Sequence, residues 1–178
     1  KSQFLPKMSH DIHTLMNDVL VMNELLLSTD LTPTQRRYAT TIHSSGQALL
    51  AIINDILDFS KIEAGRLELE QIDFDPRQIL REVRELLADR AARKGLKLTC
   101  RTGSAVPLAV RGDPHRLRQI LVNLIGNAIK FTERGEVAVD LEREATAGAA
   151  VVLRGAVRDT GIGIQPEVEP RLFHAFSQ

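Results

Sequence analysis

The chain has 178 residues, 43% of them hydrophobic and 26% charged, which suits one medium soluble domain or two small ones. Its 23 basic and 23 acidic side chains balance, so no net field attracts nucleic acid or an acidic membrane surface. A single cysteine, Cys100, excludes an internal disulfide, and we find neither a secretory leader nor an apolar run of about 20 residues, as a membrane helix needs. We therefore expect a cytoplasmic chain without direct contact to nucleic acid or membrane, whether or not a longer parent protein is anchored in the inner membrane.

The first part of the chain, to about Phe59, has the periodicity of two long helices. Apolar residues of the first helix alternate spacings of three and four, close to a heptad seam. They are Phe4, Met8, Ile12, Leu15, Val19, Met22 and Leu26. After a polar turn, Thr32 can cap a second helix with a similar seam. Each helix is apolar beyond the stripe that one partner helix covers, so we predict an antiparallel hairpin over residues 1–68 that pairs with a second copy as a four-helix bundle.

From residue 69 onward, short strands and helices follow one another in the manner of an α+β domain. The segment LELEQIDF alternates like a strand and contains the boundary between the two parts, near Leu67 to Asp73. Helices are expected from Pro76 to Gly95 and from about Asp113 to Phe131, and strands at LKLTC, LAVRG, EVAVDLE and AAVVLRGAVRD. The pattern predicts helices on one face of a mixed sheet within residues 69–178.

The helix that ends near Phe131 carries a polar face in the segment QILVNLIGNAIKFTERG. Asn123, Asn127 and Lys130 follow one another at spacings of four and three residues, which places them on one side of the helix. Asparagine oxygens are suitable Mg²⁺ ligands beside phosphate oxygens, and a lysine supplies positive charge to phosphates. The alternative is an ordinary solvent face of an amphipathic helix.

The segment DTGIGIQPE follows an apolar strand and contains a second candidate site. Gly161 and Gly163 allow the backbone to turn tightly and to approach a flat ligand closely. A carboxylate at the end of a strand, here Asp159, can accept a hydrogen bond from an exocyclic amine such as that of adenine. By itself the pattern is as often a turn as a site, and it is not a phosphate-binding P-loop.

Taken in order, NLIGNAIKFT, DTGIGI and LFHAFSQ closely resemble the N, G1 and F boxes of the sensor histidine kinases of two-component systems. MSHDIHT near the start resembles the H box of the same family, and DPHRLRQILVNL and FSKIEAGRLELE are typical of its hybrid-type members. The resemblance extends over essentially the whole chain. It implies a dimeric phosphoacceptor hairpin followed by a Bergerat-type α/β sandwich that binds ATP and Mg²⁺.

The resemblance also assigns roles to residues of the H box. His10 would be the phosphoacceptor that attacks the γ-phosphate of ATP, and Asp11 would orient its ring and accept the other ring proton. Thr14, one turn further on, would position a water molecule for removing phosphate from a partner aspartate. Side chains of adjacent helical residues do not face each other, so the role of Asp11 requires a favourable rotamer or a bent helix.

Nucleotide contacts are implied for the second part of the chain. Asn127 would hold Mg²⁺, and Asp159 would recognise adenine. The other residues implied to surround the nucleotide are Asn123 and Lys130 near the phosphates, Gly161 and Gly163 in the loop, and Phe173 and Phe176 at the ATP lid.

The H box departs from the usual pattern S-H-E-x-R-T-P-[LM]-N at several positions. The acid is the shorter Asp11, and His13 and Leu15 stand where arginine and proline are usual. Without that proline the helix keeps a backbone hydrogen bond and loses a cause of kinking. If bending there helps the catalytic domain to reach His10, autophosphorylation is slow. Our hypothesis is a hairpin that is weak as a kinase acceptor and competent as a phosphatase.

The sequence stops at Gln178, before any glycine-rich G2 box that closes over the triphosphate in the family. We expect either a piece of a longer domain, its ordered part, or a degraded catalytic domain, and in each case weak binding of ATP by these residues alone.

Two classes of function compete. The first is a histidine kinase, a phosphotransferase that passes phosphate from ATP to His10 and then to an aspartate in a response-regulator receiver domain. The second is a catalytically weak or inactive dimeric module that regulates other kinases. A gyrase-like ATP-hydrolysing clamp is disfavoured, because such proteins resemble this fold but place a glutamate base where this chain has Asn123, and they lack the hairpin.

Overall fold

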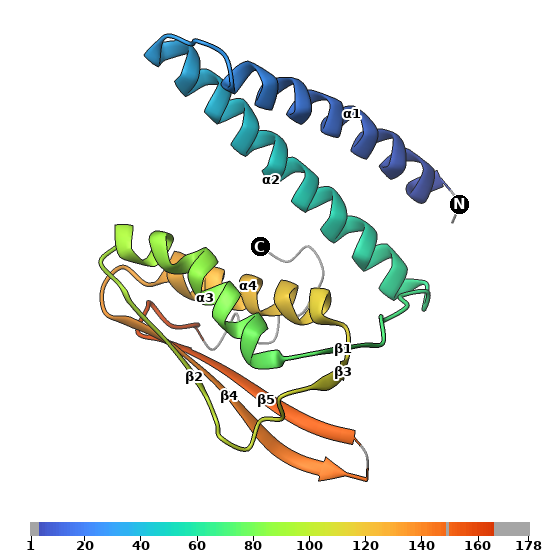
Figure 1. Ribbon diagram of the computed structural model, residues 1–178, viewed down its shortest axis with the longest axis vertical. Helices are drawn as coiled ribbons and strands as arrows, with labels where there is room; N and C mark the ends of the chain where they lie inside the picture. Colours follow the sequence, from blue (N-terminus) through green and yellow to red (C-terminus); the bar gives the residue numbers. More distant parts are fainter. Residues whose placement is uncertain (1–3, 149, 166–178) are drawn as a thin grey trace. The chain divides into compact units, whose positions relative to one another are not determined.

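The computed structural model describes residues 4–148 and 150–165, with the backbone alone for residues 4–11, 146 and 147 (Figure 1). The chain divides into two compact units, residues 1–68 and residues 69–178. The first is helical and the second combines helices with strands, so the expected α+β class with an N-terminal hairpin is confirmed.

The first unit is an antiparallel pair of helices, α1 (Phe4–Leu27) and α2 (Pro33–Glu63). Thr32 caps α2 as expected: its side chain accepts from the backbone N–H of Gln35, and the Gln35 side chain accepts from the Thr32 backbone. Gly65, with a φ of 64°, follows the end of α2. In the described part of the chain, no helix combines the length and the apolar character that crossing a membrane requires.

Small residues allow α1 and α2 to approach closely. Ala39 and Gly46 on α2 are both buried. A Cβ atom at Gly46 would lie 2.8 Å from Cδ2 of Leu20 on α1. Polar pairs also join the helices: His13 Nε2 lies 2.9 Å from Asn54 Oδ1, and Arg36 donates to the Leu27 carbonyl at the end of α1.

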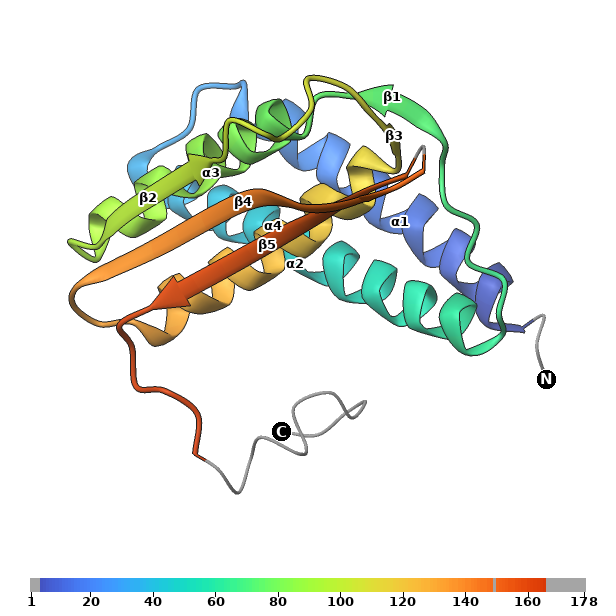
Figure 2. The ribbon, with the colours of Figure 1, turned by 90° about the horizontal axis from the view of Figure 1, so that it is seen from below.

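The second unit places two helices over one face of a sheet (Figures 1 and 2). Its elements are β1 (Ile72–Phe74), α3 (Pro76–Arg93), β2 (Lys97–Thr102), β3 (Val110–Gly112), α4 (Pro114–Phe131), β4 (Glu136–Ala147) and β5 (Ala150–Asp159). In the sheet β2-β4-β5, β2 runs parallel to β4, and β5 runs antiparallel to β4. The sheet is therefore mixed, as expected.

The core of this unit lies between the helices and the sheet. It joins buried apolar side chains of α3, α4, β4 and the connecting segments: Ile79, Leu80, Val83, Leu87, Ala91, Leu96, Val106, Leu121, Ile125, Ala128, Ile129, Val137, Val139 and Leu141. Cys100, in β2, packs against this cluster, and burial raises the pKa of its thiol.

Two expectations about the strands were wrong. Of the segment LELEQIDF, only Ile72–Phe74 is a strand, because its partner β3 is itself three residues long and the ladder ends with it. Upstream of it, the Glu70 N–H donates to the side chain of Asp113 instead of to a strand. The pair β1-β3 forms a separate two-stranded sheet, so the strands of residues 69–178 do not form a single sheet.

Candidate nucleotide site and phosphoacceptor helix

Helix α4 carries the predicted polar face, and Asp113 fixes where it begins. The Asp113 carboxylate accepts from the backbone N–H of Arg116 at 3.0 Å and from that of Glu70 at 3.2 Å. These donors, the Arg116 N–H foremost, hold the pKa of the Asp113 carboxyl below its ordinary value. The ionised Asp113 carboxylate therefore stabilises the start of α4 fully at pH values above the ordinary pKa of a carboxyl group. This stabilisation is lost only as the pH falls through the lowered pKa of Asp113.

The two sides of α4 divide as the sequence predicted. Leu121, Ile125, Ala128 and Ile129 are buried on the side that faces the core. Asn123, Asn127 and Lys130 are exposed. Helical spacing aligns these three side chains, so amide oxygens and one ammonium group are available to a ligand along the same face.

The C-terminal end of α4 is held by Lys94, which follows α3. Its ammonium group donates to the carbonyls of Ile129 and Lys130 at 2.8 Å each and to that of Thr132 at 3.1 Å. These carbonyls lack helical partners, and a cation at a helix C-terminus also complements the helix dipole. Arg118 on α4 and Glu82 on α3 form an ion pair that ties the same two helices together.

The loop after β5 packs against this end of α4. The Gly161 N–H donates to Asp159 Oδ1 at 2.9 Å and fixes the orientation of the carboxylate, and the Ile162 N–H donates to the Phe131 carbonyl at 3.4 Å. A Cβ atom on Gly161 would lie 2.5 Å from the Phe131 oxygen and 2.8 Å from Asp159 Oδ1. Only glycine fits this close approach, and Gly163 has a positive φ of 69°.

The structure therefore brings two of the sequence motifs together through Phe131. Lys130 and Asn127 lie in the last turns of α4, and the loop with Asp159 and Gly161 contacts the carbonyl that follows them. The Lys130 ammonium lies 5.0 Å from the centre of the Phe131 ring. This arrangement offers a carboxylate, amide oxygens and a cation around one helix end, which suits a ligand with an amine-bearing base and phosphates.

The donor set can be tested for its fit to Mg²⁺. Among the described residues no group of three or more His, Cys, Asp or Glu side chains could hold a metal ion. The exposed amide of Asn127 is instead a single hard oxygen ligand, which suits an ion that takes its remaining ligands from water and phosphate. The residues present fit Mg²⁺ when it arrives with a phosphate ligand.

The residues of the H box lie in the other unit. His10 and Asp11 are in α1, and their side chains fall outside the described atoms. Thr14 is exposed on the same helix, one turn after His10. Helix α1 continues without interruption through Leu15, where the family has proline, and His13 is paired with Asn54 of α2. Phe173 and Phe176 lie outside the described residues.

Sequence reasoning missed three residues that shape the candidate nucleotide site. Lys94 lies just before Gly95, the expected end of the first helix of this unit, and Phe131 is only the expected end of the second helix. Thr160 was passed over in the DTG segment, yet its hydroxyl accepts from the Glu136 N–H at 3.0 Å and joins the loop to the start of β4. Lysine in a helix C-terminal turn was the available signal for Lys94, whereas the other two roles depend on tertiary contacts.

Two family models match separate parts of the chain. Residues 1–65 match the His Kinase A (phospho-acceptor) domain, and residues 112–178 match the histidine kinase-, DNA gyrase B-, and HSP90-like ATPase family. The candidate nucleotide site and the residues that resemble an H box thus lie in separate matched ranges.

Relatives and solved structures agree with these matches. The chain is 52% identical over its whole length to the signal transduction histidine-protein kinase BarA of Escherichia coli K12, and 47% identical to the sensor protein GacS of Pseudomonas syringae. It spans 19% and 20% of these relatives. The crystal structure of full-length ShkA in complex with AMPPNP covers the whole chain at 40% identity and a TM-score of 0.78, the chain spanning 37% of it.

Proposed function

The chain belongs to the histidine kinases, and on that premise we propose that it transfers the γ-phosphoryl group of ATP to His10 and then to an aspartate of a response-regulator receiver domain. One observation carries the nucleotide half of this proposal: the loop with Asp159 and Gly161 is bonded to the end of the helix that bears Asn127. Residues for a base and for phosphates are thereby gathered in one place.

In the nucleotide site, each side chain acts by position and charge. The Asp159 carboxylate, fixed by the Gly161 N–H, accepts a hydrogen bond from the exocyclic amine of adenine. Lys130, with Asn123 beside it near the phosphates, compensates phosphate charge, and Asn127 would supply its amide oxygen to bound Mg²⁺. The metal ion, when bound, neutralises charge that develops on the phosphates. Phosphoryl transfer needs little beyond such placement and charge neutralisation.

At the acceptor, a ring nitrogen of His10 forms a bond to the γ-phosphorus while the bond from phosphorus to the β,γ-bridging oxygen breaks and ADP leaves. Asp11 orients the ring and takes the proton from its other nitrogen. In the second step the phosphorus–nitrogen bond breaks as a receiver aspartate attacks, and His10 is regenerated. Thr14 positions the water that later hydrolyses the aspartyl phosphate. Because ATP and response regulators meet in the cytoplasm, the reaction takes place there.

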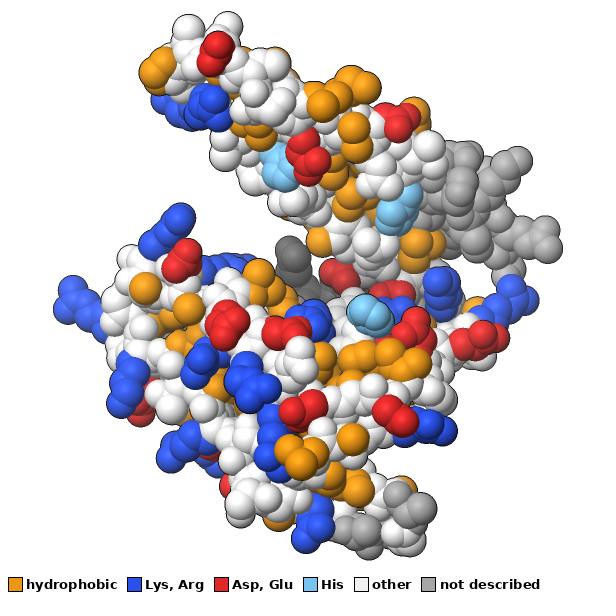
Figure 3. Space-filling model, in the orientation of Figure 1, with side chains coloured by type: hydrophobic (Ala, Val, Ile, Leu, Met, Phe, Trp, Pro, Cys, Tyr) orange, Lys and Arg blue, Asp and Glu red, His pale blue; other side chains and the backbone are white. Residues whose placement is uncertain are grey.

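Two copies act together in this proposal. In the hairpin, apolar side chains remain exposed along both helices, including Leu15, Val19, Met22, Ile42 and Ile52. Orange surface along the hairpin in Figure 3 marks side chains of this kind. Pairing of two hairpins as a four-helix bundle buries them, which makes a homodimer through residues 1–68 the form in which the acceptor helix works.

The test is label transfer from γ-labelled ATP with Mg²⁺, with an intact catalytic domain of the family added in trans if the chain alone is unlabelled. We expect label that is stable in base and lost in acid, as a phosphoramidate is, and that moves to a receiver domain on mixing. A chain that stays unlabelled even with the added catalytic domain contradicts the phosphoacceptor role and leaves the non-catalytic signalling module.

Because α1 is uninterrupted at Leu15, we expect His10 to be phosphorylated slowly, and the Leu15→Pro variant tests this. Proline removes one backbone hydrogen bond and kinks the helix just past His10, at a cost of about 3 kcal/mol to an interior helical position. We expect autophosphorylation to become several-fold faster with little change in phosphatase rate. Leu15→Ala, which loses the same seam side chain as Leu15→Pro but keeps the N–H, is the matched control and should not speed up autophosphorylation. Equal rates for Leu15→Pro and the unmodified chain would rule out bending as the missing feature.

A further inference from the structure

Asn23 is an unsatisfied polar residue inside the hairpin. It keeps only 5% of its surface exposed, on the side of α1 that packs against α2. Its Oδ1 atom is buried, and nothing in the described part of the chain donates to it. Buried amide oxygens without a donor are rare in native proteins, because the desolvated oxygen loses its water and gains nothing. Asn23 also lines an open groove on the hairpin surface, so a turn of its amide toward that groove would bring the oxygen within reach of a donor from outside the single hairpin.

A second unsatisfied atom lies on the other helix. The Nδ1 atom of His43 on α2 is also buried, and no described group bonds to it. His43 Nε2 lies 3.9 Å from a carboxylate oxygen of Glu24, the neighbour of Asn23, so both residues are at the same level of the hairpin. Each helix thus contributes one unpaired polar atom to a common layer.

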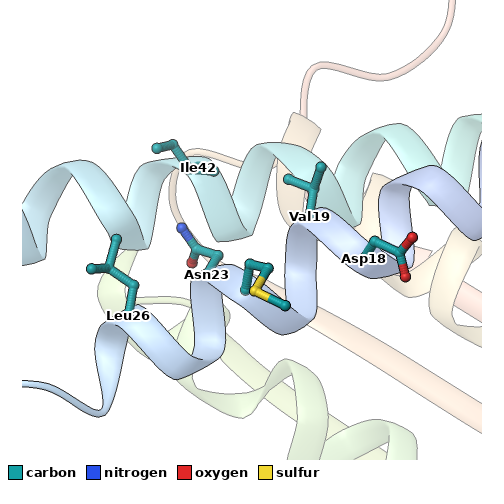
Figure 4. Close-up of a pocket in the computed structure, with 6 residues that line it drawn as sticks. Asp18, Val19, Asn23, Leu26 and Ile42 are labelled. Carbon is teal, nitrogen blue, oxygen red and sulfur yellow. The ribbon is translucent and has the colours of Figure 1, made fainter.

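Of these two residues, Asn23 lines a groove on the hairpin surface. The groove has a volume of about 400 Å³ and is lined by Asp18, Val19, Met22, Asn23, Leu26 and Ile42. Figure 4 shows Asn23 extending from α1 into the space beside Ile42 of α2, between the apolar side chains of Val19 and Leu26. The groove is therefore mainly apolar, and its polar side chains are the amide of Asn23 and the carboxylate of Asp18.

The occupant that matches this groove is a second copy of the hairpin. Exposed apolar side chains continue beyond it along α1 and along α2, from Leu15 to Leu26 and from Tyr38 to Ile56, so the partner must be a helical rod of similar length. A two-fold dimer brings identical patches together, and an amide carries both a donor and an acceptor, so two Asn23 side chains complement each other.

We propose that Asn23 pairs with the same amide of a second copy, within a polar layer completed by His43, and that this layer fixes the register of the two hairpins. The inference rests on the dimer of the proposed function. It adds a reason why the two hairpins align in one register along their apolar faces. Apolar side chains alone tolerate several alignments and oligomeric states, whereas a buried amide is satisfied in one of them, and it makes that complex weaker than an all-apolar seam would be.

The experiment compares Asn23→Leu with Gln47→Leu, which replaces an exposed amide on α2 and serves as control. Both are made in the whole chain with Cys100→Ala and Asp30→Cys, which places one spin label at the exposed turn between the helices. Sedimentation equilibrium gives the oligomeric state and dissociation constant, and electron–electron double resonance gives the distance between the two turns.

We expect one narrow distance for the parent and for Gln47→Leu. For Asn23→Leu we expect a dissociation constant lowered by about tenfold, together with broadened or multiple distances or higher oligomers. Asn23→Ala, which adds no bulk, should broaden the distances as well, with helicity by circular dichroism as the folding control. If Asn23→Leu and Asn23→Ala each form a dimer with the same single narrow distance as the parent, the register role of Asn23 is overturned and the proposed dimer stands. A monomeric parent would instead overturn the dimer of the proposed function.

Discussion

The His10→Gln variant is expected to take up no acid-labile label from γ-labelled ATP, a loss of at least about 100-fold relative to the parent chain. Glutamine keeps a polar side chain of similar size but has no nucleophilic ring nitrogen. The measurement is label retained after base treatment and lost after acid treatment, with an intact catalytic domain supplied in trans to both proteins.

His13→Gln is the matched control for this variant, because it changes the same residue type one turn further along α1. His13 is engaged with Asn54 of α2 at 2.9 Å, and a glutamine amide can still bond to that partner. We expect this variant to keep most of its label. If instead His13→Gln loses the label and His10→Gln retains it, the acceptor is His13 and the assignment of the H box is wrong.

The Gly161→Ala variant is expected to weaken binding of ATP by about tenfold or more, because overpacking at a closely packed position typically costs about 1–3 kcal/mol. The added Cβ would lie 2.5 Å from the Phe131 carbonyl oxygen, which no real Cβ contact tolerates. To relieve it, the loop must move away from α4. That movement also displaces the Gly161 N–H from Asp159 Oδ1, so the carboxylate loses its fixed orientation.

A fluorescent ATP analogue with Mg²⁺ measures this effect as a change in dissociation constant. Gly155→Ala is the control: it lies in β5, a few residues before the loop, and its Cβ would meet nothing within 4 Å. We expect Gly155→Ala to bind as the parent does. Unchanged binding by Gly161→Ala would mean that the contact between the loop and Phe131 does not position the nucleotide.

Local signals in the sequence were sufficient for the helices and for the polar face of α4. The start of α4 near Asp113 agrees with the expected one, and the spacing of Asn123, Asn127 and Lys130 was enough to predict its exposed side. These features depend on neighbours within a few residues, which sequence patterns record well.

Features that depend on distant partners could not be predicted in the same way. The strand at LELEQIDF was overextended, because its length is set by the three residues of β3, far along the chain. The close contact of Gly161 with Phe131 joins residues thirty positions apart, and the glycine alone indicated only a turn. The burial of Asn23 could not be predicted for a similar reason. In the sequence it is one polar residue beside an apolar seam, and it is buried because of how α1 packs on α2.

The contact of Lys94 with three carbonyls bears on how sequence variation at that position should be judged. The three oxygens converge on one nitrogen, at 2.8, 2.8 and 3.1 Å. An ammonium group has three donors arranged around a point, whereas a guanidinium group is flat and spreads its donors over a fork. A substitution table that treats lysine and arginine as equivalent would score an exchange here as harmless. The three carbonyls, however, require donors that converge from one nitrogen as well as a positive charge. Conserving the charge at this position therefore does not conserve these three contacts.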